Sequence, residues 1–324
     1  MPSREIHLTT VPNGLPSPEH FALVERPMPV PGAEEVLVRN RFFQVSARLR
    51  TLLANTVADT PLPSVRPGES IPSATIGDIV TAPEDSGLRP GQVVFHWAGW
   101  REYAAVPVAA VTPIDDTLPD PVAHLGSGWT AYAALTSYGK LRPGETVLIT
   151  AGAGGVGSLA GQFARQLGAG RVIGTTGSPA KAERMRAEFG YDEVLPRGAS
   201  AAADVVVDNV GGDQLSAAIA AARPGARIVL VGALASQLAH DHGKSAPVEV
   251  DNYRLILKGI SINGFADPGG REQWLRQFGD WLRTGAVTFP HVRVAGIEHA
   301  PEALHEVIAG RHAGTVVVQV EGSG

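Results

Sequence analysis

The residues that point most directly to chemistry are glycines arranged to hold a phosphate group. After a short apolar stretch, residues 146–150, the chain runs Ala151-Gly152-Ala153-Gly154-Gly155-Val156-Gly157, which contains G-x-G-x-x-G. Glycines at this spacing permit a tight turn, let a pyrophosphate approach the backbone, and let the next helix pack on its strand. The N–H groups that begin the helix then face the phosphates. Such turns also serve packing alone, but the strand–turn–helix context predicts a dinucleotide site, formed by Gly152, Gly154, Gly155, Val156 and Gly157.

The residues after the next expected strand select between two dinucleotides. A site for NADH usually has an acid about 20 residues beyond the glycine turn, where it binds the ribose hydroxyls. Residues 174–181 contain no acid. A carboxylate would repel a 2′-phosphate, whereas Thr176, Ser178 and Lys181 would bind it, with Arg197 as a further charge partner. We therefore expect NADPH as the cofactor; the alternative for Lys181 is a solvated side chain on an exposed helix face.

Composition excludes several other classes of protein. The chain has 324 residues, a formal charge of −5 and no cysteine. Without cysteine there are no disulfides, cysteine nucleophiles, iron–sulfur clusters or thiolate zinc sites. The charge balance argues against nucleic acid and anionic membranes as partners. No apolar window is long enough to cross a bilayer and no secretory signal is evident, so we expect a cytoplasmic protein with no membrane partner.

Two regions that differ in their pattern of apolar residues and turns must position these residues. Up to about residue 115, short apolar runs such as 35–39 and 92–96 alternate with Pro-Gly turns, which predicts an all-β unit. From about Pro121, β-branched runs alternate with Ala-rich stretches of helical period, which predicts a parallel sheet wrapped by helices. The expected elements are strands 146–150, 171–175, 204–208 and 227–231 and helices 155–167, 179–189, 213–222 and 274–282.

The end of the chain predicts a helix at 302–309 and a strand at 315–320. Because a single strand cannot form a domain, we expect this tail to return to the N-terminal β unit.

Two further motifs accompany the glycine turn. Gly99-Trp100-Arg101-Glu102-Tyr103 precedes it, and Asp208-Asn209-Val210-Gly211-Gly212 follows it. Together with residues 148–158, they resemble the zinc-free medium-chain dehydrogenases and reductases, and among these the alkenal/one (double-bond) reductases and quinone oxidoreductases. The resemblance covers nearly the whole chain.

The resemblance implies an α/β fold with two domains. One is a GroES-like β domain, residues 1–120 and 287–324, and the other is a Rossmann domain with a doubly wound parallel sheet, residues 121–286. It also implies a substrate cleft between the domains and a homodimer. It extends the expected NADPH contacts to Thr130, Asn209, Gly232, Phe265 and Gly314.

Departures from the family pattern are as informative as the matches. Zinc-dependent relatives hold their metal with cysteines and a G-H-E motif, at places that correspond here to Ser46, Ser73 and Ala74, so we expect no catalytic metal. We interpret the His240 and His242 pair as a solvated loop.

The substrate pocket also departs from the family pattern. Reductases of the alkenal branch usually carry D-P-Y-M-R where this chain has Ser46-Ala47-Arg48-Leu49-Arg50, which puts Arg48 at the tyrosine place. They often carry a polar residue after a G-F step where this chain has Gly264-Phe265-Ala266-Asp267-Pro268. Substrate identity therefore does not carry over.

These features predict transfer of hydride to an activated carbon–carbon double bond of a small molecule, an enone, enal or enoyl compound. The enolate oxygen could be stabilised by Arg48 or Ser46, and Tyr253 or Tyr138 could donate the proton. Structural roles remain open for each: a surface or ion-paired Arg48, a turn-forming Ser46, and a packing or rim position for Tyr253. Residues 232–253 form either a lid or a plain surface loop.

Three alternatives stay open. A quinone oxidoreductase shares the zinc-free architecture, and a biosynthetic tailoring reductase would account for the unusual pocket residues. From another class comes a non-catalytic NADPH-binding sensor or partner protein, which the missing family tyrosines would permit.

Overall fold

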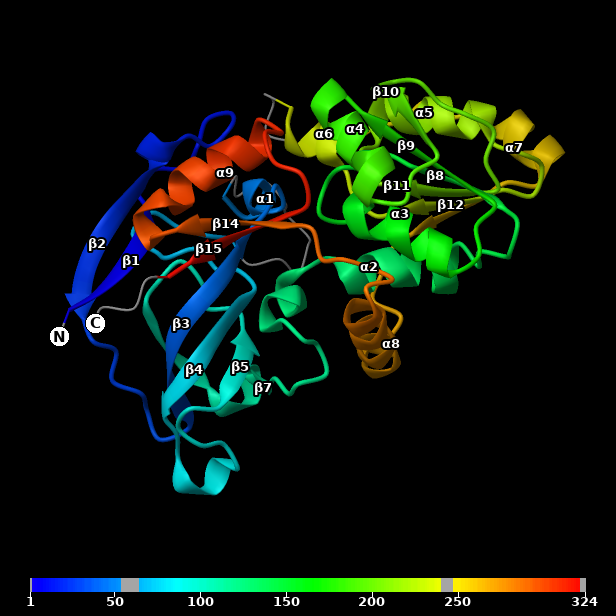
Figure 1. Cartoon of the computed structure of the whole chain (residues 1–324). Coiled ribbons are helices and arrows are strands. Elements are labelled where there is room, and N and C mark those ends of the chain that lie inside the picture. The colour runs from blue at the N-terminus through cyan, green and yellow to red at the C-terminus, as the bar shows by residue number, and fades with distance from the viewer. Residues whose placement is uncertain (1, 54–63, 240–246, 321–324) are drawn as a thin grey trace. The chain divides into compact units, whose positions relative to one another are not determined.

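A computed structural model describes residues 2–53, 64–239 and 247–320 of the chain (Figure 1). These residues divide into two compact units. Unit 1 contains residues 2–125 and 291–320, and unit 2 contains residues 126–239 and 247–290. Each unit is described by itself.

Unit 1 is built on antiparallel sheets. Within the described residues, strands β1 and β2 form one pair, and a larger sheet has the order β14-β15-β3-β4-β5-β7, with β6 also paired to β3. The inner face of this sheet is lined by Val36, Val38, Ile79, Val94 and Val106. The strands are β1 Pro2–Leu8, β2 Phe21–Pro27, β3 Glu35–Val45, β4 Thr75–Thr81, β5 Val93–His96, β6 Tyr103–Pro107, β7 Thr112–Pro113, β14 His291–Ala295 and β15 Thr315–Gln319.

The tail returns to the N-terminal β unit, as predicted. Strand β15 pairs antiparallel with β3, with Val316 opposite Val45, and parallel with β14. Helix α9, Ala300–Ile308, packs on β15 and β3. Unit 1 is completed by the short helix α1, Leu49–Leu53, and by single 3-10 turns at Pro18–His20, Glu84–Ser86, Val108–Ala110, Pro121–Leu125 and Ile297–His299.

Unit 2 is a Rossmann-type parallel sheet, which confirms the predicted fold class. Its order within the described residues is β10-β9-β8-β11-β12-β13, and all pairings are parallel. The direction of winding reverses between β8 and β11, the switch point at which such sheets bind ligands. The strands are β8 Thr146–Ile149, β9 Arg171–Thr176, β10 Glu193–Pro196, β11 Val205–Asp208, β12 Arg227–Leu230 and β13 Ser261–Gly264.

Helices cover both faces of this sheet. On one face, α5 packs against Leu148, Ile173, Val206 and Ile228. The other face carries α3 and α4 next to β8 and β9, and an aromatic cluster joins α2, α3 and α8 through Trp129, Phe163 and Phe278. The helices are α2 Gly128–Ala133, continued by a π-helical turn Ala134–Tyr138, α3 Gly157–Gln166, α4 Pro179–Glu188, α5 Gly212–Ala221, α6 Leu234–Gln237, α7 Asn252–Lys258 and α8 Arg271–Thr284.

The stretch expected to be a loop, residues 232–253, begins with α6 and ends at α7. His240 and His242 lie outside the described residues. None of the helices in the described ranges combines the length and apolarity that a membrane crossing requires.

Candidate functional site

The glycine turn lies at the carboxyl end of β8, beside the switch point of the sheet. Among the described residues, the backbone N–H groups of Gly155, Val156 and Gly157 donate no hydrogen bond, although Gly154 and Ser158 on either side do. These three donors stand at the start of α3, where the helix dipole adds partial positive charge. The turn is therefore a cradle for an anionic group such as a pyrophosphate.

The glycines of this turn serve different purposes. A Cβ on Gly157 would lie 2.6 Å from the backbone of Ala151 and Gly152, and one on Gly152 would lie 2.5 Å from Cε of Met185 and 2.8 Å from the Tyr191 hydroxyl. A Cβ on Gly154 would meet only the carbonyl oxygen of Ala151, at 3.4 Å. Packing explains Gly152 and Gly157, whereas the space beside Gly154 is open to a ligand.

The side chains of Tyr191 and Thr175 form hydrogen bonds with the backbone of the glycine turn. The hydroxyl of Tyr191 lies 2.8 Å from the carbonyl oxygen of Gly157 and 3.2 Å from that of Gly152. Burial raises the pKa of Tyr191 well above its ordinary value, so the hydroxyl keeps its proton. On the other side, the Ala151 N–H donates to Oγ1 of Thr175, at 3.2 Å. Ala151 itself has φ 50°, a left-handed conformation that costs energy for a residue with a Cβ.

At the switch point, a network of hydrogen bonds joins the end of β8 to the end of β11. Oγ1 of Thr150 donates to Asp208 at 2.8 Å and accepts the N–H of Asn209 at 2.8 Å, while the Asn209 side-chain amide donates to the Thr150 carbonyl. The Asp208 carboxylate also accepts the N–H of Gly211 at 2.8 Å. Burial raises the pKa of Asp208, and these hydrogen bonds oppose the rise. Asn209 is thus fixed beside the glycine turn.

The residues expected to meet a 2′-phosphate gather after β9. The Ser178 hydroxyl accepts the N–H of Lys181 at 3.4 Å, which caps α4 and leaves the hydroxyl proton free to donate. The guanidinium of Arg197 lies over Gly177, 3.2 to 3.4 Å from where a Cβ would stand. Thr176 accepts the Ser178 N–H at 3.3 Å. Burial lowers the pKa of Lys181. These four side chains therefore surround one short turn that contains no carboxylate.

The remaining residues expected at the cofactor are spread over both units. Thr130 lies on α2, Gly232 follows β12 close to the Asn209 carbonyl, and Phe265 follows β13, all in unit 2. Gly314 precedes β15 in unit 1, with φ 86°. The Tyr138 hydroxyl, an expected proton donor, is 2.8 Å from the carbonyl oxygen of Ala266 and 3.2 Å from its nitrogen. It therefore already links the π-helical turn to the segment after Phe265.

Of the expected catalytic residues, Ser46 and Arg48 belong to unit 1 and Tyr253 to unit 2. Ser46 directly follows β3, and its carbonyl accepts the Leu49 N–H at 3.1 Å. Arg48 is exposed, with its guanidinium carbon 5.4 Å from the centre of the Trp97 ring.

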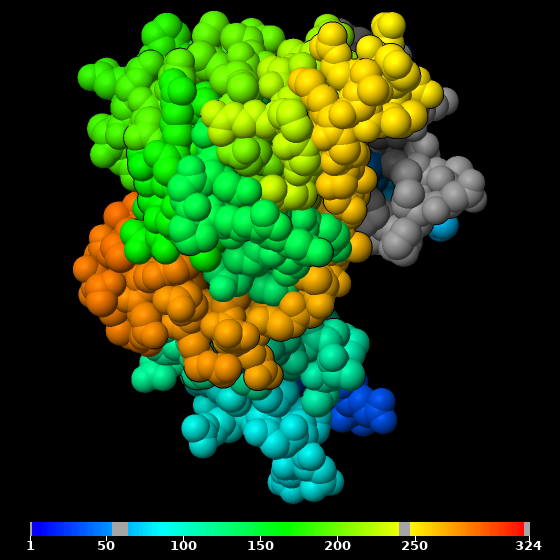
Figure 2. All heavy atoms as spheres, turned by 90° about the vertical axis from the view of Figure 1, so that its right-hand side faces the viewer, coloured from blue at the N-terminus to red at the C-terminus, as the bar shows by residue number. Residues whose placement is uncertain are grey.

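Helix α7 exposes an apolar patch on unit 2 (yellow in Figure 2). Tyr253, Ile256 and Leu257 are 67%, 73% and 68% exposed. No hydrogen bond joins the Tyr253 hydroxyl to another described residue. Its proton can exchange with solvent, and its position is that of a rim or surface residue.

The places that correspond to metal ligands in zinc-dependent relatives carry no ligands here. Ser73 and Ala74 are buried beside β4, and the Ser73 hydroxyl meets no partner among the described residues. Nor does any group of three His, Asp or Glu side chains in those residues lie close enough together to hold a metal ion. A hydroxyl and a methyl group cannot replace thiolate and imidazole as zinc ligands.

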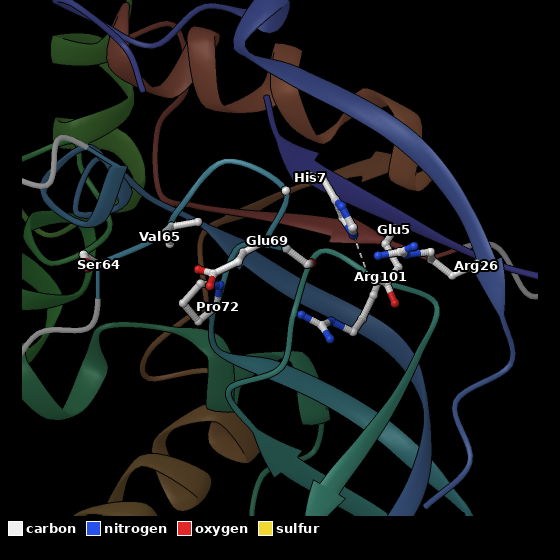
Figure 3. A pocket seen from close by; sticks show the side chains of 10 residues that line it. Glu5, His7, Arg26, Ser64, Val65, Glu69, Pro72 and Arg101 are labelled. Atoms are coloured by element: carbon white, nitrogen blue, oxygen red, sulfur yellow. Dashed lines mark hydrogen bonds and ion pairs between the residues drawn. The ribbon is translucent and has the colours of Figure 1, made fainter. Parts of the chain in front are cut away.

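A cavity of about 470 Å³ opens in unit 1 between β1, β2 and the loop before β4 (Figure 3). His7 Nε2 lies 2.9 Å from Oε2 of Glu5, and the Arg101 side chain extends toward the wall formed by Glu69 and Pro72. Burial lowers the pKa of Arg101, and the charge of Glu5 opposes this. Two carboxylates, Glu5 and Glu69, and two guanidinium groups, Arg26 and Arg101, line this cavity together with Val65 and Pro72.

The sequence motifs led to the glycine turn but not to the residues that support it. Tyr191, Thr150 and Asp208 lie in ordinary helix-end and strand positions, and only the packing of unit 2 reveals their contacts. Asp208 stands in the D-N-V-G-G motif and Thr150 in the motif of residues 148–158, whereas no motif contains Tyr191.

Two family models match the chain. One, described as the N-terminal domain of oxidoreductase, matches residues 4–114, and the other, described as zinc-binding dehydrogenase, matches residues 155–282. The second description names a metal that this cysteine-free chain has no ligands to hold in the family's manner.

Individual relatives extend along nearly the whole chain. The (+)-pulegone reductase of Mentha piperita is 31% identical over 308 residues, which cover 88% of this chain and 87% of that protein. The NADPH-dependent curcumin reductase of Escherichia coli (strain K12) is 27% identical over 342 residues, with 97% and 96% covered. The crystal structure of CurA in complex with NADPH from Vibrio vulnificus aligns with a TM-score of 0.86 at 27% identity, covering 98% of this chain and 99% of that one. The chain belongs to the zinc-free medium-chain dehydrogenases and reductases.

Proposed function

We propose that this protein is an NADPH-dependent, zinc-independent reductase of activated carbon–carbon double bonds. The observation that carries the proposal is the set of N–H groups at Gly155, Val156 and Gly157, which donate no hydrogen bond among the described residues. The turn after the next strand, β9, adds to it: this turn contains no acid, and the guanidinium of Arg197 lies close to its Gly177. The relatives that it resembles include reductases of pulegone and curcumin, both named for conjugated ketones.

The residues present fit NADPH. The cradle would hold the pyrophosphate, and the open side of Gly154 would allow it to approach. Lys181 and Arg197 would pair with the 2′-phosphate, while Thr176 and Ser178 would donate hydrogen bonds to it. Asn209, Gly232 and Phe265 follow the carboxyl ends of the neighbouring strands β11, β12 and β13, and Thr130 and Gly314 complete the proposed set.

When bound, NADPH supplies the hydride that adds to the β-carbon of an α,β-unsaturated carbonyl compound. The positive charge of Arg48 would stabilise the enolate oxygen that develops, and the Ser46 hydroxyl would donate a hydrogen bond to it. A proton then adds to the α-carbon, and the exposed hydroxyl of Tyr253 or water would deliver it.

The domains would divide this work. We assign substrate binding to residues 1–120 and 287–324 and NADPH binding to residues 121–286. A cytoplasmic homodimer accords with this assignment. Strand β13 is the last in its sheet among the described strands, and the apolar patch of α7 lies next to it in the chain.

Loss of reduced-nicotinamide absorbance with a panel of enones, enals and quinones tests the proposal. Turnover of enones with NADPH, with reduction of the double bond seen in the product, would support it. Turnover of quinones alone would favour a quinone oxidoreductase, and tight NADPH binding without any turnover would favour the sensor protein. Absence of NADPH binding by calorimetry would refute all of these.

A further inference from the structure

Trp97 is far more exposed than three other tryptophans of the described residues. Trp97 is 49% exposed, whereas Trp100, Trp129 and Trp274 are 0%, 7% and 4% exposed. The indole of Trp97 is held on one side by the ring of Phe95, edge to face, with ring centres 5.6 Å apart. A large aromatic ring that is fixed in place and open to solvent is a surface on which a flat ligand can stack.

The guanidinium of Arg48 adds a second flat group to this surface. Its carbon lies 5.4 Å from the centre of the Trp97 ring, and no carboxylate of the described residues is within 4.0 Å of it. By contrast, the exposed arginines Arg39 and Arg41 both pair with Asp78. The charge of Arg48 is thus left uncompensated by any described acid, and a guanidinium can stack on rings and donate hydrogen bonds from its edge together.

Backbone hydrogen bonds tie this pair to the proposed reaction site. The Ser73 N–H donates to the carbonyl of Trp97 at 3.0 Å, and the Gln44 N–H donates to the carbonyl of Ala74 at 2.8 Å. Ser46 is two residues from Gln44 and two from Arg48. Ser46 and Arg48 therefore follow the end of β3, and Trp97 follows the end of β5, which is separated from β3 in the sheet by β4 alone.

We propose that Trp97 and Arg48 form an aryl subsite, which makes aryl-conjugated enones the preferred acceptors over alkyl enones. The inference rests on the proposed function, because that function places Arg48 at the substrate carbonyl. The aryl ring of the acceptor stacks on the indole beside the guanidinium of Arg48, so that the conjugated carbonyl, in the plane of that ring, accepts a hydrogen bond from the N–H edge of Arg48. Trp97 acts as a specificity-determining residue in this arrangement.

Steady-state kinetics with benzylideneacetone and ethylideneacetone test the subsite. These enones share the reacting group and differ in the phenyl ring. We expect the ratio of kcat/KM for the aryl over the alkyl enone to fall about tenfold in Trp97→Leu, mainly through KM, and to recover largely in Trp97→Phe. The control Arg41→Leu alters an exposed arginine stacked 5.8 Å from the Phe42 ring, and it should keep the wild-type ratio. An unchanged ratio in Trp97→Leu would overturn the proposal.

Calorimetry with benzylacetone, the saturated aryl ketone, separates the subsite from the reaction. Its affinity should fall about tenfold in Trp97→Leu and in Arg48→Leu, with thermal unfolding confirming that each variant is folded. If these losses occur but no enone is reduced, the subsite stands and the proposed reaction fails. If benzylacetone binds the variants as it binds the wild type, the subsite is refuted whatever the turnover.

Discussion

The buried hydroxyl of Tyr191 lies 2.8 Å from the carbonyl oxygen of Gly157, the last residue of the glycine turn. Removing this hydroxyl deletes its hydrogen bonds to the turn and leaves every proposed cofactor contact in place. We expect Tyr191→Phe to lower the free energy of unfolding by about 1 to 2 kcal/mol and to weaken NADPH binding several-fold. Urea unfolding and calorimetry measure the two effects. The matched control is Tyr132→Phe, since the Tyr132 hydroxyl has no hydrogen-bond partner among the described residues, and equal effects in both variants would contradict the role of Tyr191.

Two glycine variants should separate packing from binding. Gly154→Ala adds a methyl group that meets only the Ala151 carbonyl at 3.4 Å, so the unfolding temperature should hardly change while NADPH affinity falls at least about tenfold. Gly152→Ala brings a methyl group within 2.5 Å of Met185, so it should lower stability by about 1 to 3 kcal/mol. Comparable NADPH affinity in Gly154→Ala and the wild type would remove the main support for the site.

The choice of NADPH over NADH should depend on Lys181 and Arg197. Each charge-assisted contact with a phosphate is worth about 1.5 to 3 kcal/mol, so Lys181→Ala or Arg197→Ala should raise KM for NADPH about tenfold or more and leave KM for NADH nearly the same. Arg184→Ala is the control, because this exposed arginine of α4 pairs with Glu188. A parallel rise for both nucleotides would show that these residues do not recognise the 2′-phosphate.

The hydroxyl of Thr150 should contribute strongly to the stability of the fold. Thr150→Val removes a donor to the buried Asp208 carboxylate and an acceptor for the Asn209 N–H, so we expect a loss of about 2 to 3 kcal/mol in unfolding free energy. Thr146→Val, at the other end of β8, is the comparison, because its hydroxyl meets the exposed side of Arg223 at 3.1 Å. Chemical denaturation of both variants should show the larger loss at Thr150.

His96 should make the protein sensitive to acid. Burial, with the charge of Arg101 as a smaller cause, lowers the pKa of His96 from 6.5 to about 4. As the pH falls, the unfolded chain therefore binds this proton before the folded protein does. The contribution of His96 to the free energy of unfolding is fully present above pH 6.5 and is lost as the pH falls toward 4. The whole decline is on the order of 3 kcal/mol.

His96→Asn keeps an acceptor for the Ala98 N–H, now 3.1 Å from His96 Nδ1, and does not titrate. Unfolding of this variant near pH 5 should take up about one proton fewer than the wild type. His299→Asn, at an exposed histidine, should behave as the wild type does, and an unaltered acid limb in His96→Asn would contradict the assignment.

The central strands of unit 2 were predictable because their composition leaves little choice. Strands β8 and β11 consist of buried β-branched and aliphatic residues such as Val147, Ile149 and Val206, and helix α3 carries one apolar stripe. The edge strands escaped prediction. Strand β10 ends in Pro196 and is only half buried, and β13 reads Ser-Ile-Asn-Gly, because an edge strand needs no continuous apolar run.

The site was predictable where it is local in sequence and not where it is assembled by packing. The glycine turn and the absence of an acid before Lys181 can be read from adjacent residues. Tyr191 reaches Gly157 across 34 positions and Thr150 reaches Asp208 across 58, and no period in the sequence encodes those distances. The Arg48–Trp97 contact likewise joins two loops that only the pairing of β3, β4 and β5 brings together.

The late position of β15 in the chain has a consequence for biosynthesis. A ribosome completes every strand of unit 2 before it reaches Thr315, so the nucleotide-binding sheet can form while residues 42–45 of β3 still lack the partner that will cover them. At ordinary translation rates, the time between the synthesis of residues 42–45 and the synthesis of Thr315 is roughly 15 to 50 seconds. The nascent chain therefore presents an open strand edge for most of its synthesis, which makes the N-terminal unit the part most exposed to misassembly.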